Sequence, residues 1–146
     1  MKLKKIIWLL FFCGITLNAQ SQYNCLKNLE DAKALSKKVV ESFMDSKISK
    51  SFEEMKYYWP LPENEIDDLQ EKTTKYLNIL EDRMMGKPIG YEKTKEETLG
   101  DFAIRETYII KYPISAIRLK FVYYKNEKGW ILNSFKWDDT FSEEFK

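Results

Sequence analysis

The sequence has no histidine among its 146 residues. This absence excludes catalytic triads that use histidine as the base, zinc sites with histidine ligands, and pH switches that rely on an imidazole. Cysteine is also scarce, with Cys13 and Cys25 as the two residues. If processing removes Cys13, the remaining thiol cannot form an internal disulfide, so the fold must depend on its hydrophobic core. We expect Cys25 to be a partly buried, inert thiol or, alternatively, to form an intermolecular disulfide.

An excess of charge of one sign is absent as well. The formal net charge is +1, but the first 19 residues contain three lysines and no acidic residue, which leaves 21 basic and 23 acidic residues in the remainder. A net charge of −2 gives no field that would attract nucleic acid or an anionic membrane. The acidic residues near the end, Asp138–Asp139 and Glu143–Glu144, offer too few ligands at loop spacing for calcium. We therefore predict no nucleic-acid partner, no membrane association after processing, no metal site and no cofactor.

The N-terminal residues have the three parts of a secretory signal peptide. Met1–Lys5 is basic, Ile6–Leu17 is an apolar run, and small Ala19 suits the position before a cleavage site. The apolar run is shorter than the roughly 20 residues that a transmembrane helix needs. We predict cleavage near Ala19–Gln20 and export to the periplasm or the extracellular space. An uncleaved anchor and lipid attachment at Cys13 are the alternatives.

The remaining residues, 20–146, are predicted to form one domain, because the length and the hydrophobic fraction of 44% suit a single core. Three amphipathic helices come first: residues 24–44, a shorter helix that ends by Trp59, and residues 63–84 or 63–85. Ser51 or Ser49 is a candidate N-cap of the second helix. The third helix has apolar or small residues at steps of three and four: Ile66, Leu69, Thr73, Tyr76, Leu80 and Met84.

After Lys87 the hydrophobic period changes from three or four residues to two. Strands are predicted over residues 89–99, 102–112, 117–124 and 130–138, and the first is a charged edge strand. Short turns between consecutive strands require antiparallel neighbours. The predicted fold class is α+β, with three N-terminal helices packed on a curled antiparallel sheet of about four strands.

This order of elements resembles that of the nuclear transport factor 2-like superfamily, the cystatin-like α+β cone, over about residues 24–141. The closing segment, Lys128–Trp137, adds to the resemblance, because a Gly-Trp pair such as Gly129–Trp130 opens the last strand in many small secreted members. The resemblance implies a cone between the helices and the sheet, and a homodimer through the outer face of the sheet. The superfamily includes isomerases, dehydratases, ligand carriers and domains without known activity, so the resemblance does not fix a function.

Glu106 is the one candidate catalytic residue. It shares a strand face with Ile104, Tyr108 and Ile110. If this face is the inner one, a carboxylate lies among apolar side chains, which makes it a candidate base. The alternatives are that Glu106 pairs with a cross-strand cation such as Lys120, or that this face is the outer one.

Aromatic residues are the candidates for a ligand pocket. Three of them adjoin Pro60, and three more come from the third helix and two strands; the set is Tyr57, Tyr58, Trp59, Tyr76, Tyr108 and Tyr123. Aromatic walls with a few polar groups suit a small apolar or aromatic ligand. Core packing is the alternative for these side chains.

The leading functional prediction is an exported, non-catalytic domain that binds a ligand or another protein. One alternative is a cofactor-independent isomerase or dehydratase that uses a pocket carboxylate. Another is a secreted inhibitor or immunity-type protein that acts through its surface.

Overall fold

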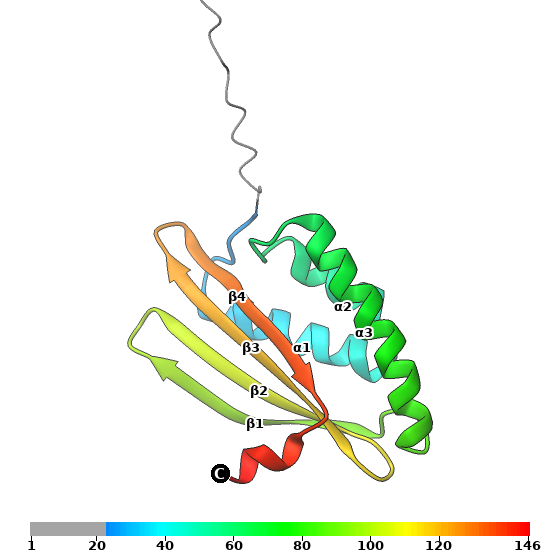
Figure 1. Ribbon diagram of the computed structural model, residues 1–146. Coiled ribbons are helices and arrows are strands. Elements are labelled where there is room, and N and C mark those ends of the chain that lie inside the picture. The colour runs from blue at the N-terminus through cyan, green and yellow to red at the C-terminus, as the bar shows by residue number, and fades with distance from the viewer. Residues whose placement is uncertain (1–22) are drawn as a thin grey trace, which may run out of the picture.

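The computed structural model describes residues 23–146, so the predicted signal peptide and Cys13 lie outside the described residues. Three helices precede four antiparallel strands and a short 3-10 helix, η1 (Phe141–Phe145). Figure 1 shows α1 crossing one face of the sheet and α3 running beside β4. The predicted α+β class is therefore confirmed, with a sheet that is open rather than closed into a barrel. No helix within residues 23–146 is both long and apolar enough to cross a membrane.

Helix α1 (Leu29–Met44) begins five residues later than the pattern predicts. The side chain of Asn28 accepts a hydrogen bond from the backbone N–H of Asp31 at 2.8 Å, which is an N-cap. The residues before it are extended, because Leu26 exchanges two backbone hydrogen bonds of 2.8 Å with Trp130 of the last strand. The predicted start at residue 24 is therefore wrong, since this segment pairs with the sheet instead.

Helices α2 (Ile48–Lys56) and α3 (Glu63–Arg83) are separated by the Pro60 and Pro62 region. Ser51 does not cap α2, because it lies within the helix and its hydroxyl donates to the carbonyl oxygens of Val39 and Lys47 at 3.4 Å. The buried side of α3 consists of Ile66, Thr73, Leu77 and Leu80. Leu69 and Tyr76, which the spacing assigns to the same side, are 40% and 48% exposed.

The sheet is a simple meander in the order β1-β2-β3-β4. Its strands are β1 (Gly90–Leu99), β2 (Ala103–Lys111), β3 (Ala116–Asn126) and β4 (Gly129–Asp138), within two residues of the predicted bounds. The inner face meets the helices, and its residues on β3 are Ile117, Leu119, Phe121 and Tyr123, all with no exposed area. A bulge between Lys93 and Lys95 shifts the register of β1.

Aromatic rings fill the space between the helices and the β3–β4 half of the sheet. The ring of Phe135 lies edge-on to Phe43, Phe52 and Trp59, with centroid distances of 5.9, 6.0 and 6.1 Å. Phe121 completes the cluster at 5.1 Å from Phe135. Edge-to-face packing of this kind stabilises a core beyond the area that it buries. The cluster therefore fills the space between the helices and this half of the sheet.

Candidate functional site

A groove between α3 and β4 has the aromatic walls that the sequence suggested for a pocket. Its cavity volume is about 310 Å³. The residues that line this α3–β4 groove are Phe52, Trp59, Leu69, Thr73, Phe135, Lys136, Trp137 and Asp138. Most of the wall is apolar, whereas Thr73, Lys136 and Asp138 provide polar groups. A few polar groups in an apolar wall are typical of ligand sites.

Two contacts of Trp137 hold the groove together. Its indole Nε1–H donates a hydrogen bond to the hydroxyl of Thr73 at 3.1 Å. Its ring lies against Tyr76, with 5.8 Å between the ring centroids. Thr73 is buried, so its hydroxyl needs a partner, and the indole N–H supplies one. Helix α3 therefore holds the side chain of Trp137 in place.

Apolar side chains continue from the groove over the exposed surface of α3. Leu69, Tyr76 and Ile79 are 40%, 48% and 44% exposed. Leu69 and Tyr76 border the buried stripe of α3, and Ile79, three residues after Tyr76, lies next to Tyr76 on the side away from the stripe. A helix that only packs on its own domain needs one apolar stripe, and here a second set of apolar residues borders the first. Contiguous exposed apolar residues mark surfaces that contact other molecules.

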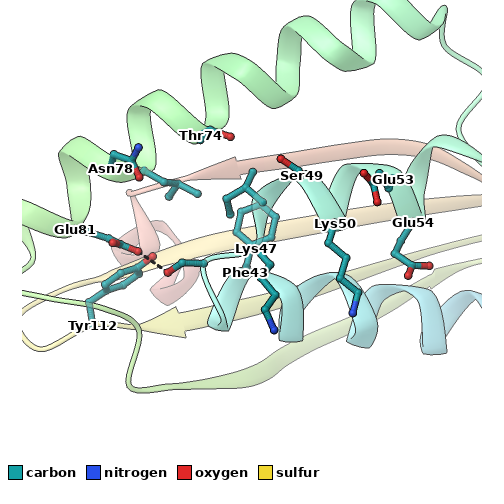
Figure 2. A pocket seen from close by; sticks show the side chains of 13 residues that line it. Phe43, Lys47, Ser49, Lys50, Glu53, Glu54, Thr74, Asn78, Glu81 and Tyr112 are labelled. Atoms are coloured by element: carbon teal, nitrogen blue, oxygen red, sulfur yellow. Dashed lines mark hydrogen bonds between the residues drawn. The ribbon is translucent and has the colours of Figure 1, made fainter.

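A second groove, between α2 and α3, is larger and has more polar groups in its wall. Its cavity volume is about 540 Å³, and it is lined by residues of the α1–α2 turn, α2, α3 and Tyr112. Ser46 donates a hydrogen bond of 2.8 Å to Glu81 at one end of this groove. Figure 2 shows that the charged groups of Lys50, Glu53 and Glu54 do not converge on one point. A site for a charged ligand needs convergent groups, so the geometry favours the α3–β4 groove.

Glu106 lies on the inner face of β2 with no exposed area. Its Oε1 accepts a hydrogen bond from Lys93 Nζ at 2.8 Å. The same ammonium group contacts Glu96, which also binds Lys33 of α1 at 2.8 Å. Desolvation lowers the pKa of Lys93, but its hydrogen bonds to Glu106 and Glu96 outweigh this effect and raise the pKa well above its usual value. Glu106 is therefore one end of a chain of four alternating charges.

The cation that pairs with Glu106 comes from β1, not from β3. Lys120 lies on the outer face, opposite Thr107, and binds Glu144 at 2.9 Å. The pairing with Lys120 that the sequence suggested is therefore wrong, whereas a cross-strand ion pair is present. Glu106 Oε2 is buried and has no hydrogen-bond partner among the described residues. A buried oxygen without a partner is unusual in folded proteins.

The six aromatic residues that the sequence suggested for a pocket do not line one common cavity. Trp59 lines the α3–β4 groove, and Tyr76 adjoins that groove through Trp137. Tyr57 is 63% exposed and, together with Trp59 and Tyr23, lines a different pocket of about 600 Å³. That these aromatic residues bind a ligand stays a prediction, and Trp59 and Tyr76 are the two that lie at the α3–β4 groove.

The other three of the six lie in or against the core. Tyr58 is half-buried and packs against the core cluster. Tyr123 is fully buried, and its hydroxyl forms a hydrogen bond of 2.7 Å with Ser36 of α1. Burial, together with the charge of Glu106, raises the pKa of Tyr108 to about 12. Of the residues that line the groove, sequence reasoning named only Trp59 as a pocket residue and missed seven. The alternation of Phe135 and Trp137 with polar neighbours in the last strand was the signal that could have located these two.

Comparisons with known proteins give one distant match. No family model matches the chain, and a search of curated proteins finds no match. A search of solved structures finds a crystal structure from Campylobacter jejuni whose protein carries the provisional name nuclear transport factor 2-like transpeptidase. The similarity has a TM-score of 0.48 and 12% identity, and covers 70% of this chain and 97% of that chain. At these values it carries no argument about activity.

Proposed function

We propose that this protein is a non-catalytic binding domain that holds an apolar or aromatic group of a ligand or partner protein in the α3–β4 groove. The supporting observation is the contrast between two spaces. The interior beside β3 and β4 is filled by the rings of Phe43, Phe52, Phe121 and Phe135. The groove beside Trp137 is open, with a cavity of about 310 Å³.

The size of the groove restricts what it takes. A volume of 310 Å³ is near the lower end of the range for ligand sites, roughly 300 to 1,000 Å³. It suits one aromatic ring or one branched aliphatic chain rather than a large cofactor. The exposed residues Leu69, Tyr76 and Ile79 extend the apolar contact beyond the groove. A partner that inserts one side chain would bury these residues at the same time.

A neutral apolar dye tests this proposal directly. N-phenyl-1-naphthylamine fluoresces when it enters an apolar site, and we expect the full chain to bind it saturably, with the phenyl ring in the groove and the naphthyl group on the exposed apolar residues of α3. Leu69→Glu places a charge at the groove wall and should weaken dye binding at least ten-fold. Ile114→Glu is the matched control, because Ile114 is an apolar residue of the β2–β3 turn that is 62% exposed. Equal dye binding by both variants would refute the assignment of the groove.

We also propose that the domain acts after export, on the basis of the basic, apolar and small-residue segments of residues 1–19. Sequencing the N-terminus of the protein recovered from the periplasm or medium tests this. A start near Gln20 is expected, whereas a start at Met1 or Cys13 would contradict cleavage at Ala19.

A second candidate function is proton abstraction by Glu106. The observation in its favour is the buried Oε2, which has no hydrogen-bond partner among the described residues. The observation against it is the ion pair with Lys93 at 2.8 Å, which is a structural use of the same carboxylate. Turnover of small enolisable ketones that Glu106→Gln abolishes would favour this candidate. Absence of turnover in the intact, exported protein would remove it.

A further inference from the structure

The carboxylate of Glu144 lies among three cations on the outer face of the sheet. Arg118 Nη1 is 2.6 Å from Oε1, Lys120 Nζ is 2.9 Å from the same oxygen, and Lys95 Nζ is 2.9 Å from Oε2. The cations come from β1 and β3, whereas Glu144 belongs to η1, which follows the sheet. We call the three cations the Lys95–Arg118–Lys120 cradle. Three cations thus contact one carboxylate, where an ordinary ion pair has one.

The cradle is a built site rather than a set of surface lysines. With residues 139–146 bound, the side chain of Arg118 is only 8% exposed. Its guanidinium binds Asp138 of the sheet at 2.8 Å and Glu143 of that segment at 3.1 Å. Arg118 and Asp138 are directly opposite each other on β3 and β4, so Asp138 orients the guanidinium independently of the segment. An oriented guanidinium suits recognition of a carboxylate.

A buried hydroxyl in the same place has no partner. Thr107 is 1% exposed, and its Oγ1 has no hydrogen-bond partner among the described residues. In the sheet register Thr107 lies between Lys95 and Lys120, so the three side chains share the outer face. The Thr107 hydroxyl is therefore one polar group beside the cradle to which residues 139–146 make no hydrogen bond.

The segment that occupies the cradle is held mainly by charge. Helix η1 has no buried residue, and Phe145 is 86% exposed. The turn into η1 depends on Asp138, whose Oδ1 accepts hydrogen bonds from the backbone N–H and the hydroxyl of Thr140 at 2.9 and 2.6 Å. Residues 139–146 thus have little apolar contact with the sheet that would oppose displacement by a competing acidic segment.

We propose that the Lys95–Arg118–Lys120 cradle binds an acidic segment of a partner protein, and that residues 139–146 occupy it as an exchangeable intramolecular substitute. The chemistry of the partner follows from the cradle: a glutamate or aspartate carboxylate that reaches Arg118 and both lysines, and a second acceptor for Thr107. This site is separate from the α3–β4 groove, so the proposal does not rest on the function assigned to that groove.

A peptide supplied in trans tests the proposal with the full chain. Glu144→Gln removes the resident carboxylate, and the probe is the octapeptide Asp-Thr-Phe-Ser-Glu-Glu-Phe-Lys, which repeats residues 139–146. By calorimetry at low salt, the variant should bind the peptide at least ten-fold more tightly than the unaltered chain does. A peptide with both glutamates replaced by glutamine should not bind, and 0.5 M NaCl should weaken binding by the acidic peptide strongly.

Two further variants in the Glu144→Gln background make the result specific. Lys120→Gln should abolish peptide binding, whereas Lys111→Gln, at an outer-face lysine outside the cradle, should leave it unchanged. Circular dichroism of both variants serves as the check that they are folded. Equal binding of the acidic and glutamine peptides, or no gain on Glu144→Gln, would overturn the proposal. Self-association of the Glu144→Gln chain in sedimentation, without peptide binding, would overturn it in favour of a second copy of this chain as the occupant.

Discussion

The indole N–H of Trp137 donates a hydrogen bond to the hydroxyl of Thr73 at 3.1 Å and thereby joins the last strand to the longest helix. The two residues are 64 positions apart in the chain. Their contact fixes the position of the Trp137 ring at the α3–β4 groove, where Tyr76 packs on it. The geometry of the groove thus depends on a side-chain contact rather than on backbone pairing.

Thr73→Val should destabilise the fold by about 1 kcal/mol, because it leaves the Trp137 indole N–H without its partner. Valine has nearly the same volume as threonine, so packing should not contribute to the loss. Urea unfolding measures the change. Thr74→Val is the matched control: the Thr74 hydroxyl donates at 2.9 Å to Gln70 in its own helix, so its loss should change stability by less. Equal losses would show that the contact across the groove contributes nothing specific.

Lys93→Met should destabilise the protein by about 2 to 3 kcal/mol, because it leaves the buried carboxylate of Glu106 without its cation. The loss is smaller than for a fully buried pair, since the side chain of Lys93 is 33% exposed. Lys33→Met is the control. Its partner Glu96 is itself 33% exposed, so the loss should be less than about 1 kcal/mol. Denaturation curves in which Lys33→Met costs as much as Lys93→Met would contradict a special role for the Glu106 pair.

Stability should fall as pH rises above about 10, in part because of Tyr108. Burial raises the pKa of Tyr108 from 10.0 to about 12 in the folded protein. The folded state therefore holds its proton more tightly than the unfolded state does. This contribution is complete below pH 10 and is lost between pH 10 and 12. Tyr108→Phe should flatten the dependence of the unfolding free energy on pH in this window. An unchanged slope in the variant would exclude Tyr108 as a source of the alkaline loss.

Acid should release η1 from the sheet before the domain unfolds. Desolvation raises the pKa of Glu144, but hydrogen bonds from Lys120, Lys95 and Arg118 outweigh it and lower the pKa from 4.5 to about 2. A depressed pKa stabilises the folded state above pH 4.5, and this contribution is lost as pH falls towards 2. NMR titration of the Glu144 carboxyl carbon should show a midpoint well below 4.5, the ordinary value for a glutamate. A midpoint at or above 4.5 would contradict the cradle.

The period of apolar residues was sufficient to predict three helices, four strands and their antiparallel order. It did not identify the inward face of α3. Leu69 and Tyr76 lie beside the stripe that contains Leu77, and only the packing of α3 against its neighbours decides between them. Local periodicity carries no information about that packing.

The ion pairs between side chains of neighbouring strands were also hard to predict, because they depend on the register of the strands. Strict alternation assigns each residue to a face, but the bulge between Lys93 and Lys95 interrupts it in β1. The bulge moves Lys95 to the outer face, opposite Thr107, so that Lys93, opposite Tyr108, is the inner-face cation that pairs with Glu106. The groove was missed because its walls come from residues distant in the chain, such as Thr73 and Trp137.

The most direct test of the binding function is the NMR resonance of the Trp137 indole N–H during titration with indole. We predict a saturable shift of this resonance that exceeds the shift of the Trp130 indole, which serves as the internal reference because Trp130 lies near the other end of β4. Thr73→Val identifies the Trp137 signal, since it removes the hydrogen-bond acceptor. An invariant Trp137 resonance at indole concentrations that shift other residues would contradict a binding site in the α3–β4 groove.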